Sequence, residues 1–399
     1  MGREWRAVVV GVGTIGRIHI HALRRNRVHV ASVVGSSPAR ALAAAEAVGG
    51  PRGDPDLATA LANADADVVH ICTPNLHHYA LAREALLAGK HVVCEKPLTI
   101  TSAEAADLHE LAASSGLVHA VCFNNRFYPL VQDIAARMRS GEIGRPFLLR
   151  ASIADDSLWL DTDGGWRLDP AQGGPSIVTA TIGSHLVDLA SLCLASRVRA
   201  VCADFETVHP VRRRPRPGAA GQWQEYHLSG EEVATLLVRF ENGAPGALAL
   251  SQVSAGHPYR ITLEIDGSGC GVQWDSERPN ELWLGYRNRP NVLVIPDPNV
   301  MSPAARPYAE YPGCYRQGFD DTFRVLFRQV YAHIGIPAEL RPAPDFPTFA
   351  DGHGGMLVLD AAIRSARERR WVDVDWSGHD ALVARARVAA VRTTSGAAR

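Results

Sequence analysis

The first 125 residues alternate short apolar runs with longer segments of helical spacing. Five apolar runs have the length and composition of buried strands, at residues 7–10, 27–34, 65–73, 91–94 and 118–125. Helical segments lie between them, at residues 38–48 and 79–88 and from Ser102 onward. This alternation predicts a parallel, doubly wound sheet of the α/β class.

The pattern changes after residue 125, where strands with tight turns and long polar loops replace the strand–helix rhythm. Examples lie at residues 234–240, 248–253, 260–265 and 271–274. They predict a C-terminal α+β domain with a large open, mainly antiparallel sheet. We expect a first domain over residues 1–125, a second over 126–378 and a fraying tail over 379–399. Residues 211–221 are rich in arginine, proline and glycine, which favours a mobile loop, with a phosphate-binding patch as the alternative.

Composition and charge narrow the class of protein and its partners. The chain has 399 residues, of which 46% are hydrophobic and 21% charged, and a formal net charge of −1. These values are typical of a globular protein and favour neither nucleic acid nor an anionic membrane. The sequence has no signal-peptide pattern, no apolar run of membrane-spanning length and no C-x-x-C pair among its seven cysteines. We expect a cytoplasmic protein with reduced thiols, no bound metal, and neither a nucleic-acid nor a membrane partner.

A glycine-rich turn follows the first apolar run. Gly11, Gly13 and Gly16 have the spacing G-x-G-x-x-G between a predicted strand and a predicted helix, with Thr14 and Ile15 inside the motif. The first glycine permits the turn, the second lets a pyrophosphate approach the backbone, and the third lets helix and strand pack closely. The helix N-terminus offers free N–H groups to the phosphates. The motif therefore predicts a Rossmann domain that binds NAD or NADP.

The residues after the second apolar run bear on which cofactor binds. A carboxylate there would bind the ribose hydroxyls of NAD and repel the extra phosphate of NADP. The chain has Gly35, Ser36, Ser37, Pro38 and Arg40 in this segment and no carboxylate. The two hydroxyls can donate to a phosphate and the guanidinium can neutralise it, which favours NADP. Ser37 before Pro38 is also a good helix start, and both interpretations can hold at once.

Two further segments fall at the carboxyl ends of predicted strands, where sites on doubly wound sheets form. One is Thr73 and Pro74 with the residues that follow, and the other is the Glu-Lys-Pro sequence at residues 95–97. His77 and His78 are adjacent, so on a helix they would point in different directions. We therefore do not expect them to form a metal-binding pair.

The glycine motif, the sequence CTPNLHH and the run AGKHVVCEKPLT at residues 88–99 resemble the Gfo/Idh/MocA family of oxidoreductases. Glu-Lys-Pro is the most specific mark of that family. The resemblance implies that Lys96 lies beside the nicotinamide and substrate and assists proton transfer, and that the Lys96–Pro97 peptide is cis. It also implies a cofactor site formed by Gly11, Gly13, Thr14, Ile15, Gly16, Ser36, Ser37, Arg40, Thr73, Pro74, Asn75, His78, Glu95 and Lys96.

Residues 183–189 resemble the family's second active-site segment, in which a helix carries Asp-x-x-x-His. Side chains four residues apart share a helix face, so the carboxylate can orient the imidazole and stabilise its charged form. The histidine exchanges a proton with the substrate oxygen, which contributes about 10²- to 10⁴-fold to the rate. His185 matches this histidine, but Thr181 stands at the aspartate position. Threonine can hydrogen-bond an imidazole but cannot offset its charge.

The remaining sequence resembles a sugar-oxidising branch of the family and departs from it in the substrate half. Tyr315 and Gln317 replace a histidine and a glutamate of that branch, and Asp156 is the one match to its Gln-Asp-Trp segment, in which Asp155 is a departure. The resemblance implies substrate contacts at Lys96, Asp156, Trp166, Arg167, Thr181, His185, Asp188 and Tyr315.

Together these features predict an NAD(P)-dependent dehydrogenase or reductase acting on a secondary alcohol or ketone of a sugar, cyclitol or glycoside. One alternative is a redox-neutral enzyme that holds NAD tightly, oxidises a sugar carbon, permits elimination or epimerisation and returns the hydride, which would fit Thr181. Another is a nucleotide-sensing protein without catalysis. The resemblance also implies a homodimer or homotetramer built through the free face of the C-terminal sheet.

Overall fold

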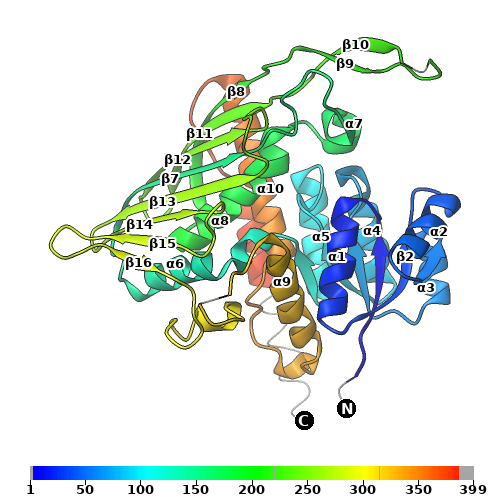
Figure 1. The fold of residues 1–399 in the computed structure, drawn as a ribbon, viewed down its shortest axis with the longest axis horizontal. Coiled ribbons are helices and arrows are strands. Elements are labelled where there is room, and N and C mark those ends of the chain that lie inside the picture. The colour runs from blue at the N-terminus through cyan, green and yellow to red at the C-terminus, as the bar shows by residue number, and fades with distance from the viewer. Residues whose placement is uncertain (1–2, 220, 314, 386–399) are drawn as a thin grey trace. The chain divides into compact units, whose positions relative to one another are not determined.

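The computed structural model of the protein describes residues 3–219, 221–313 and 315–385 (Figure 1). The chain divides into two compact units. Of the described residues, unit 1 contains 3–124, 320–356 and 375–385, and unit 2 contains those within 125–319 and 357–374. Among the described helices, none is both long enough and apolar enough to span a bilayer.

Unit 1 is built on a six-stranded sheet. In sheet order the strands are β3 (Arg52–Asp54), β2 (His29–Val34), β1 (Arg6–Val10), β4 (Val68–Ile71), β5 (His91–Cys94) and β6 (His119–Val121). Every pairing between them is parallel. The order 3-2-1-4-5-6 is that of the dinucleotide-binding fold, so the predicted Rossmann sheet is confirmed. The short β3 was not predicted because Arg-Gly-Asp has no apolar run.

Helices connect these strands, and polar side chains mark several of their starts. The connecting helices are α1 (Thr14–Arg25), α2 (Pro38–Ala47), α3 (Leu57–Asn63), η1 (Asn75–His77), α4 (His78–Leu87) and α5 (Ser102–Ser115). Unit 1 also contains α9 (Phe319–Ile334), η6 (Ala338–Leu340) and the first part of α10 (Phe349–Glu368), which come later in the chain. Thr101 and Glu104 form a capping box at the start of α5. Asp56 accepts from the backbone N–H of Thr59 at the start of α3. Each cap satisfies an N–H group that has no partner inside its helix.

Unit 2 is built on a nine-stranded sheet. In sheet order the strands are β16 (Val292–Val294), β15 (Leu282–Gly285), β14 (Gly271–Asp275), β13 (Arg260–Gly267), β7 (Pro146–Ala154), β12 (Pro245–Ser251), β11 (Val233–Phe240), β8 (Val198–Glu206) and β17 (Val372–Asp373). β7 and β12 pair in parallel and the other neighbours pair antiparallel, so the predicted, mainly antiparallel sheet is confirmed. Burial alternates along β11, as expected for a sheet with one covered and one open face.

The helices of unit 2 include two that pack against this sheet, α6 and α8. In chain order its helical segments are η2 (Asn124–Phe127), α6 (Pro129–Ser140), η3 (Trp166–Leu168), α7 (Pro170–Gly173), the π-helix η4 (Thr179–Gly183), α8 (Ser184–Leu194), η5 (Arg306–Tyr308) and the second part of α10. Leu186, Leu189 and Ala190 of α8 are fully buried. The helix therefore has an apolar side that anchors it in the core of unit 2.

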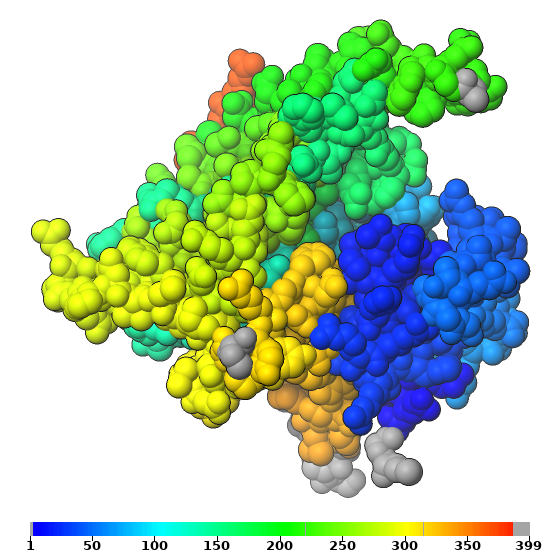
Figure 2. Space-filling model, viewed as in Figure 1, coloured from blue at the N-terminus to red at the C-terminus, as the bar shows by residue number. Residues whose placement is uncertain are grey.

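Residues 211–215, in the first half of the predicted mobile loop, form a strand. β9 (Val211–Pro215) pairs antiparallel with β10 (Trp223–His227) in a hairpin at the surface of unit 2 (Figure 2). Arg212 is fully buried, where it pairs with Glu232 and donates to the carbonyl oxygen of Leu160 at 2.7 Å. The buried guanidinium fixes β9, so the prediction was wrong for this segment because composition does not show which arginine is inside.

The first residues of the segment predicted as a fraying tail are helical, so that prediction was wrong for residues 379–385. Residues 377–385 are helical, while residues 386–399 lie outside the described part of the chain. The described cysteines carry free thiols, as expected: Cys72, Cys94, Cys122, Cys193, Cys202 and Cys270.

Candidate active site

The glycine turn of unit 1 lies between β1 and α1, and each glycine has a different reason to lack a side chain. Gly11 has φ +92°, and a Cβ there would lie 2.5 Å from the carbonyl oxygen of Cys72. A Cβ at Gly16 would lie 2.0 Å from the carbonyl oxygen of Gly11. A Cβ at Gly13 would meet no atom within 4 Å. Gly11 and Gly16 are therefore required by the fold, whereas Gly13 leaves open space at the N-terminus of α1.

The turn has the features that a dinucleotide pyrophosphate requires. Gly13 is the N-cap of α1 and supplies no side-chain cap, so the N-terminal N–H groups of this 12-residue helix are available to an anion. Thr73 follows β4, the neighbour of β1, and its buried Oγ1 has no hydrogen-bond partner among the described residues. A buried hydroxyl without a partner is costly, and a bound ligand would satisfy it. The residues present therefore fit the cofactor.

The residues after β2 combine a helix cap with an exposed cation. Ser37 accepts from the backbone N–H of Arg40 and starts α2. The Arg40 guanidinium donates to Ser36 Oγ at 3.2 Å. A Cβ at Gly35 would lie 2.6 Å from the backbone nitrogen of Ala41, so the close approach of α2 requires glycine at the position where a carboxylate would read the NAD ribose.

The Glu-Lys-Pro segment follows β5, and its backbone is held by a histidine. The Lys96–Pro97 peptide is cis, as predicted. His78 is buried on α4, with Nδ1 2.8 Å from the Pro97 carbonyl oxygen and Nε2 2.9 Å from the Thr73 carbonyl oxygen. Burial lowers the pKa of His78, although both carbonyls favour its charged form. His78 therefore links the loops after β4 and β5 through the backbone.

Glu95 begins a buried chain of polar side chains that sequence reasoning missed. Its Oε1 lies 3.1 Å from His19 Nε2, His19 Nδ1 lies 3.1 Å from His70 Nδ1, and His70 Nε2 lies 3.0 Å from the hydroxyl of Tyr331. Burial would raise the pKa of Glu95, but the hydrogen bond and charge of His19 and the charge of Lys96 outweigh it and lower the pKa. Burial, then His19, lowers the pKa of His70 well below its usual value. Glu95 is thus held as a carboxylate next to Lys96.

In unit 2 the predicted histidine lies at the start of a helix with an irregular entry. His185 is the second residue of α8 and is 5% exposed. Thr181 lies in the π-helix η4 that precedes α8, and its backbone N–H donates to the carbonyl oxygen of Ile177 at 2.9 Å. π-Helical turns are uncommon and frequent at functional sites.

A carboxylate lies one turn after His185 on the same helix. Asp188 is three residues further along α8, on the same side of the helix as His185. It accepts from Arg126 through both carboxylate oxygens, with Nε at 2.7 Å from Oδ2. Arg126 offsets the charge of Asp188, and Asp188 follows His185 instead of standing four residues before it, where the family has its aspartate.

Glu231 organises the entry to this helix, and sequence analysis did not single it out. It is 3% exposed and accepts from Ser176 Oγ and from the backbone N–H groups of Ile177 and Thr179, the last at 2.9 Å. The only signal in the sequence was a pair of acidic residues, 231 and 232, at the start of an apolar strand. Such a pair is usually solvent-exposed, and only the fold shows that both are buried.

The remaining predicted substrate contacts have different degrees of exposure. Asp156 is exposed, whereas its neighbour Asp155 is buried and accepts from Ser157 and Gln252. The Arg167 guanidinium lies 4.6 Å from the ring centre of Trp166. Tyr315 is 65% exposed. Within unit 1 the fold gathers the glycine turn, Thr73 and the Glu-Lys-Pro segment at the carboxyl ends of adjacent strands, and within unit 2 it gathers Thr181, His185 and Asp188 around the start of α8.

Two family models match this chain. Residues 5–123 match the oxidoreductase family with an NAD-binding Rossmann fold, and residues 131–272 match the GFO/IDH/MocA C-terminal domain. Levoglucosan dehydrogenase of Pseudarthrobacter phenanthrenivorans is 29% identical over 355 residues, which cover 85% of this chain and 88% of the relative. D-glucoside 3-dehydrogenase of Escherichia coli is 28% identical over 244 residues, which cover 60% of this chain and 67% of the relative.

A solved structure of levoglucosan dehydrogenase in complex with NADH superposes with a TM-score of 0.83 and 25% sequence identity. The match covers 94% of this chain and 100% of that one. The similarity therefore extends through both units.

Proposed function

Because the chain belongs to the Gfo/Idh/MocA family of oxidoreductases, we propose that it is an NAD(P)-dependent dehydrogenase or reductase of a sugar, cyclitol or glycoside. The reacting group would be a secondary alcohol or its ketone. The observation that carries the proposal is the placement of Lys96, beside buried Glu95 after β5, at the same sheet edge as the glycine turn. A cation at that edge is adjacent to the space that a bound dinucleotide requires.

In this proposal, different residues contact different parts of the dinucleotide. The open backbone at Gly13 and the N-terminus of α1 would hold the pyrophosphate, and Thr73 Oγ1 would donate to or accept from the same ligand. Asn75 in η1 and His78 at the start of α4 follow β4 and would line the cofactor site. When bound, the nicotinamide accepts or supplies the hydride. The protein's own side chains carry out the proton transfers.

We assign proton transfer at the substrate oxygen to Lys96 and His185. Oxidation of an alcohol releases a proton from its hydroxyl, and reduction of a ketone requires one at the oxygen. The lysine ammonium can stabilise the developing negative charge on that oxygen, and His185 can take up the proton or return it. The His185 position near the start of a buried helix supports this role, with Asp188 and Arg126 fixing the following turn.

The preference for NADP(H) over NAD(H) is the finer part of the proposal. It rests on the absence of a carboxylate from residues 35–40 and on the exposed Arg40 guanidinium beside Ser36. Because the related solved structure holds NADH, the affinities of this protein for NADPH and for NADH have to be compared directly. Titration with NADPH and NADH, followed by nicotinamide fluorescence, should give the lower dissociation constant for NADPH in the wild type. Arg40→Ala should remove the difference, and tighter binding of NADH by the wild type would contradict the preference.

The substrate class is tested with an activity panel. The names of the two relatives support an anhydrosugar or a glucoside as substrate. Purified protein is incubated with each oxidised cofactor and with levoglucosan, a methyl D-glucoside or myo-inositol, and reduced nicotinamide is followed by absorbance. Turnover of at least one compound, lost in Lys96→Met, is expected. Binding of a cofactor without turnover of any alcohol, or of the corresponding keto-sugars in the reverse direction, would contradict a dehydrogenase and favour a nucleotide sensor.

Thr181 favours the redox-neutral alternative as a second candidate, because a rebuilt proton relay suits a reaction with no net oxidation. The freshly purified protein is denatured without added nucleotide, and any released dinucleotide is identified by mass spectrometry. Stoichiometric NAD carried through purification would support the second candidate over the first. An empty protein that binds NADPH reversibly would support an ordinary dehydrogenase.

We also infer that unit 2 forms a homodimer or homotetramer through the open face of its sheet. Leu237 on β11 is 47% exposed and Trp283 on β15 is 41% exposed, which supports an apolar contact there. Sedimentation of the wild type should give an oligomer, and Leu237→Asp should shift it toward the monomer. A wild type that sediments as a monomer would contradict the inference.

A further inference from the structure

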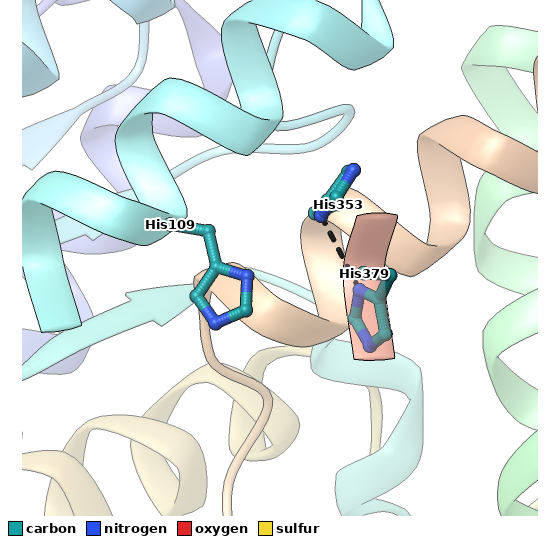
Figure 3. A group of neighbouring side chains, drawn as sticks. All are labelled: His109, His353 and His379. Carbon is teal, nitrogen blue, oxygen red and sulfur yellow. Dashed lines mark hydrogen bonds between the residues drawn. The ribbon is translucent and has the colours of Figure 1, made fainter. Parts of the chain in front are cut away.

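Three histidines that are far apart in the sequence meet in unit 1. His109 lies on α5, His353 on α10 and His379 on the helix at residues 377–385 (Figure 3). One ring nitrogen from each can be chosen so that all three lie within 4.8 Å of one another. His109 and His353 are each 3% exposed, and His379 is half-buried.

The local packing brings these rings together for identifiable reasons. A Cβ at Gly354 would lie 3.0 Å from the ring of Trp376 and 3.8 Å from the ring of His379, so glycine on α10 allows the C-terminal helix to approach. Trp376 then contacts His379 edge-on, with ring centres 5.3 Å apart. The histidine rings are therefore placed by a close approach of two helices.

The polar atoms of the cluster are incompletely satisfied. His353 Nδ1 and His379 Nδ1 lie 3.3 Å apart and share one hydrogen bond. His109 Nδ1 is buried and has no hydrogen-bond partner in the described part of the chain. A buried ring nitrogen without a partner is unfavourable unless a ligand satisfies it.

The protonation state of the rings and the distance between their nitrogens both suit a bound metal ion. Burial, then the neighbouring His379, lowers the pKa of His109 and of His353 to about 4, so both are neutral and hold a lone pair at neutral pH. In a tetrahedral site with Zn–N bonds of 2.0–2.1 Å, ligand nitrogens lie about 3.3 Å apart. The His353–His379 nitrogen pair already has this spacing, at 3.3 Å.

We propose that His109, His353 and His379 bind one divalent transition-metal ion, with zinc the expected occupant. Three imidazoles are a ligand set that zinc accepts, and cobalt, nickel and copper ions suit the same nitrogens. A water molecule would be the fourth ligand of a tetrahedral site. The ion fastens the C-terminal helix to α5 and α10, so this site is structural and separate from the dehydrogenase chemistry.

Metal binding is measured on the full chain without an affinity tag, after dialysis against a chelator. Wild-type protein is titrated with Zn²⁺ and with Co²⁺, and bound metal is counted by mass spectrometry after desalting. We expect one ion per chain, visible Co²⁺ absorption from nitrogen ligands, and a rise of a few degrees in the thermal midpoint on adding Zn²⁺.

His379→Ala and His379→Gln are the main variants, because this half-buried position is the least disruptive to folding. Each should lose the bound ion and the thermal shift while remaining folded by circular dichroism. His227→Ala, at an exposed position on β10, is the matched control and should keep both. Failure of the wild type to bind one ion, or equal binding by wild type and both His379 variants, would overturn the proposal.

Discussion

The two units place their candidate site residues by different physical means. In unit 1 the site is shaped by backbone: glycines that no side chain can replace, a cis peptide, and a histidine that contacts two carbonyl oxygens. In unit 2 it is held by buried charged groups. Glu231 accepts hydrogen bonds from the backbone that leads into α8, Asp188 pairs with Arg126, and Glu232 pairs with Arg212. Backbone constraints come from short sequence motifs, whereas buried ion pairs join residues from separate segments. The candidate site of unit 1 is therefore easier to recognise from local sequence than that of unit 2.

The largest expected effect falls on the backbone-shaped unit. The chain has two lysines, Lys90 and Lys96, at opposite ends of β5. Lys96→Met should lower kcat by about 10²- to 10⁴-fold, because proton transfer and charge stabilisation are lost. Cofactor affinity, measured by nicotinamide fluorescence, should change by much less than kcat, because the glycine turn of the cofactor site is intact. Lys90→Met is the matched control, and an equal loss of activity in both variants would contradict a specific role for Lys96.

The next prediction concerns the buried ion pair of unit 2. Arg212→Met leaves the buried carboxylate of Glu232 without its guanidinium, which should cost about 3–5 kcal/mol in the free energy of unfolding. Urea denaturation followed by circular dichroism measures it. Arg213→Met removes the neighbouring exposed pair with Asp161 and should leave the midpoint nearly unchanged. Similar denaturation midpoints for the two variants would show that the buried Arg212–Glu232 pair contributes no more to stability than the exposed pair.

A third variant separates cofactor binding from stability in unit 1. Gly13→Val fills space that is empty in the protein and keeps an accessible backbone conformation, so the thermal midpoint should fall only slightly, because valine is a poorer N-cap than glycine. It should weaken dinucleotide binding by about 10- to 100-fold, as expected from the loss of a hydrogen bond to a charged group. Gly16→Ala should instead lower the midpoint, because its Cβ would meet the Gly11 carbonyl oxygen. A Gly13→Val protein with wild-type affinity would show that the glycine turn does not hold the cofactor.

The smallest expected effect concerns the helix entry of unit 2. Glu231→Gln retains the shape but not the charge of a group that accepts two backbone N–H bonds, and should cost about 1–3 kcal/mol of stability. As a positioning residue for His185 it should also lower kcat more than it raises KM. Glu225→Gln, exposed on β10, is the control. Unchanged kcat together with reduced stability would limit Glu231 to a structural role.

The reach of sequence-based prediction differs between the same two units. The apolar run at residues 91–94 became β5 with identical bounds, and the predicted helix from Ser102 became α5 with a capping box. In unit 2 the four strand ranges given as examples match β11, β12, β13 and β14 within a few residues, but the π-helix and the β9–β10 hairpin were missed. A one-dimensional pattern reports periodicity and local caps, and it does not show which arginine of an arginine-rich run is buried.

The sequence by itself determined the alternation of strands and helices, the glycine turn and the position of Lys96, because each depends on neighbours within a few residues. Only the tertiary structure decided that Glu95 joins His19, His70 and Tyr331, and that His109, His353 and His379 meet. His70 and Tyr331 are 261 residues apart in the sequence, and His109 and His379 are 270 residues apart. Their chemistry arises from shared burial, which raises the cost of any polar atom left without a partner and which a local pattern cannot record.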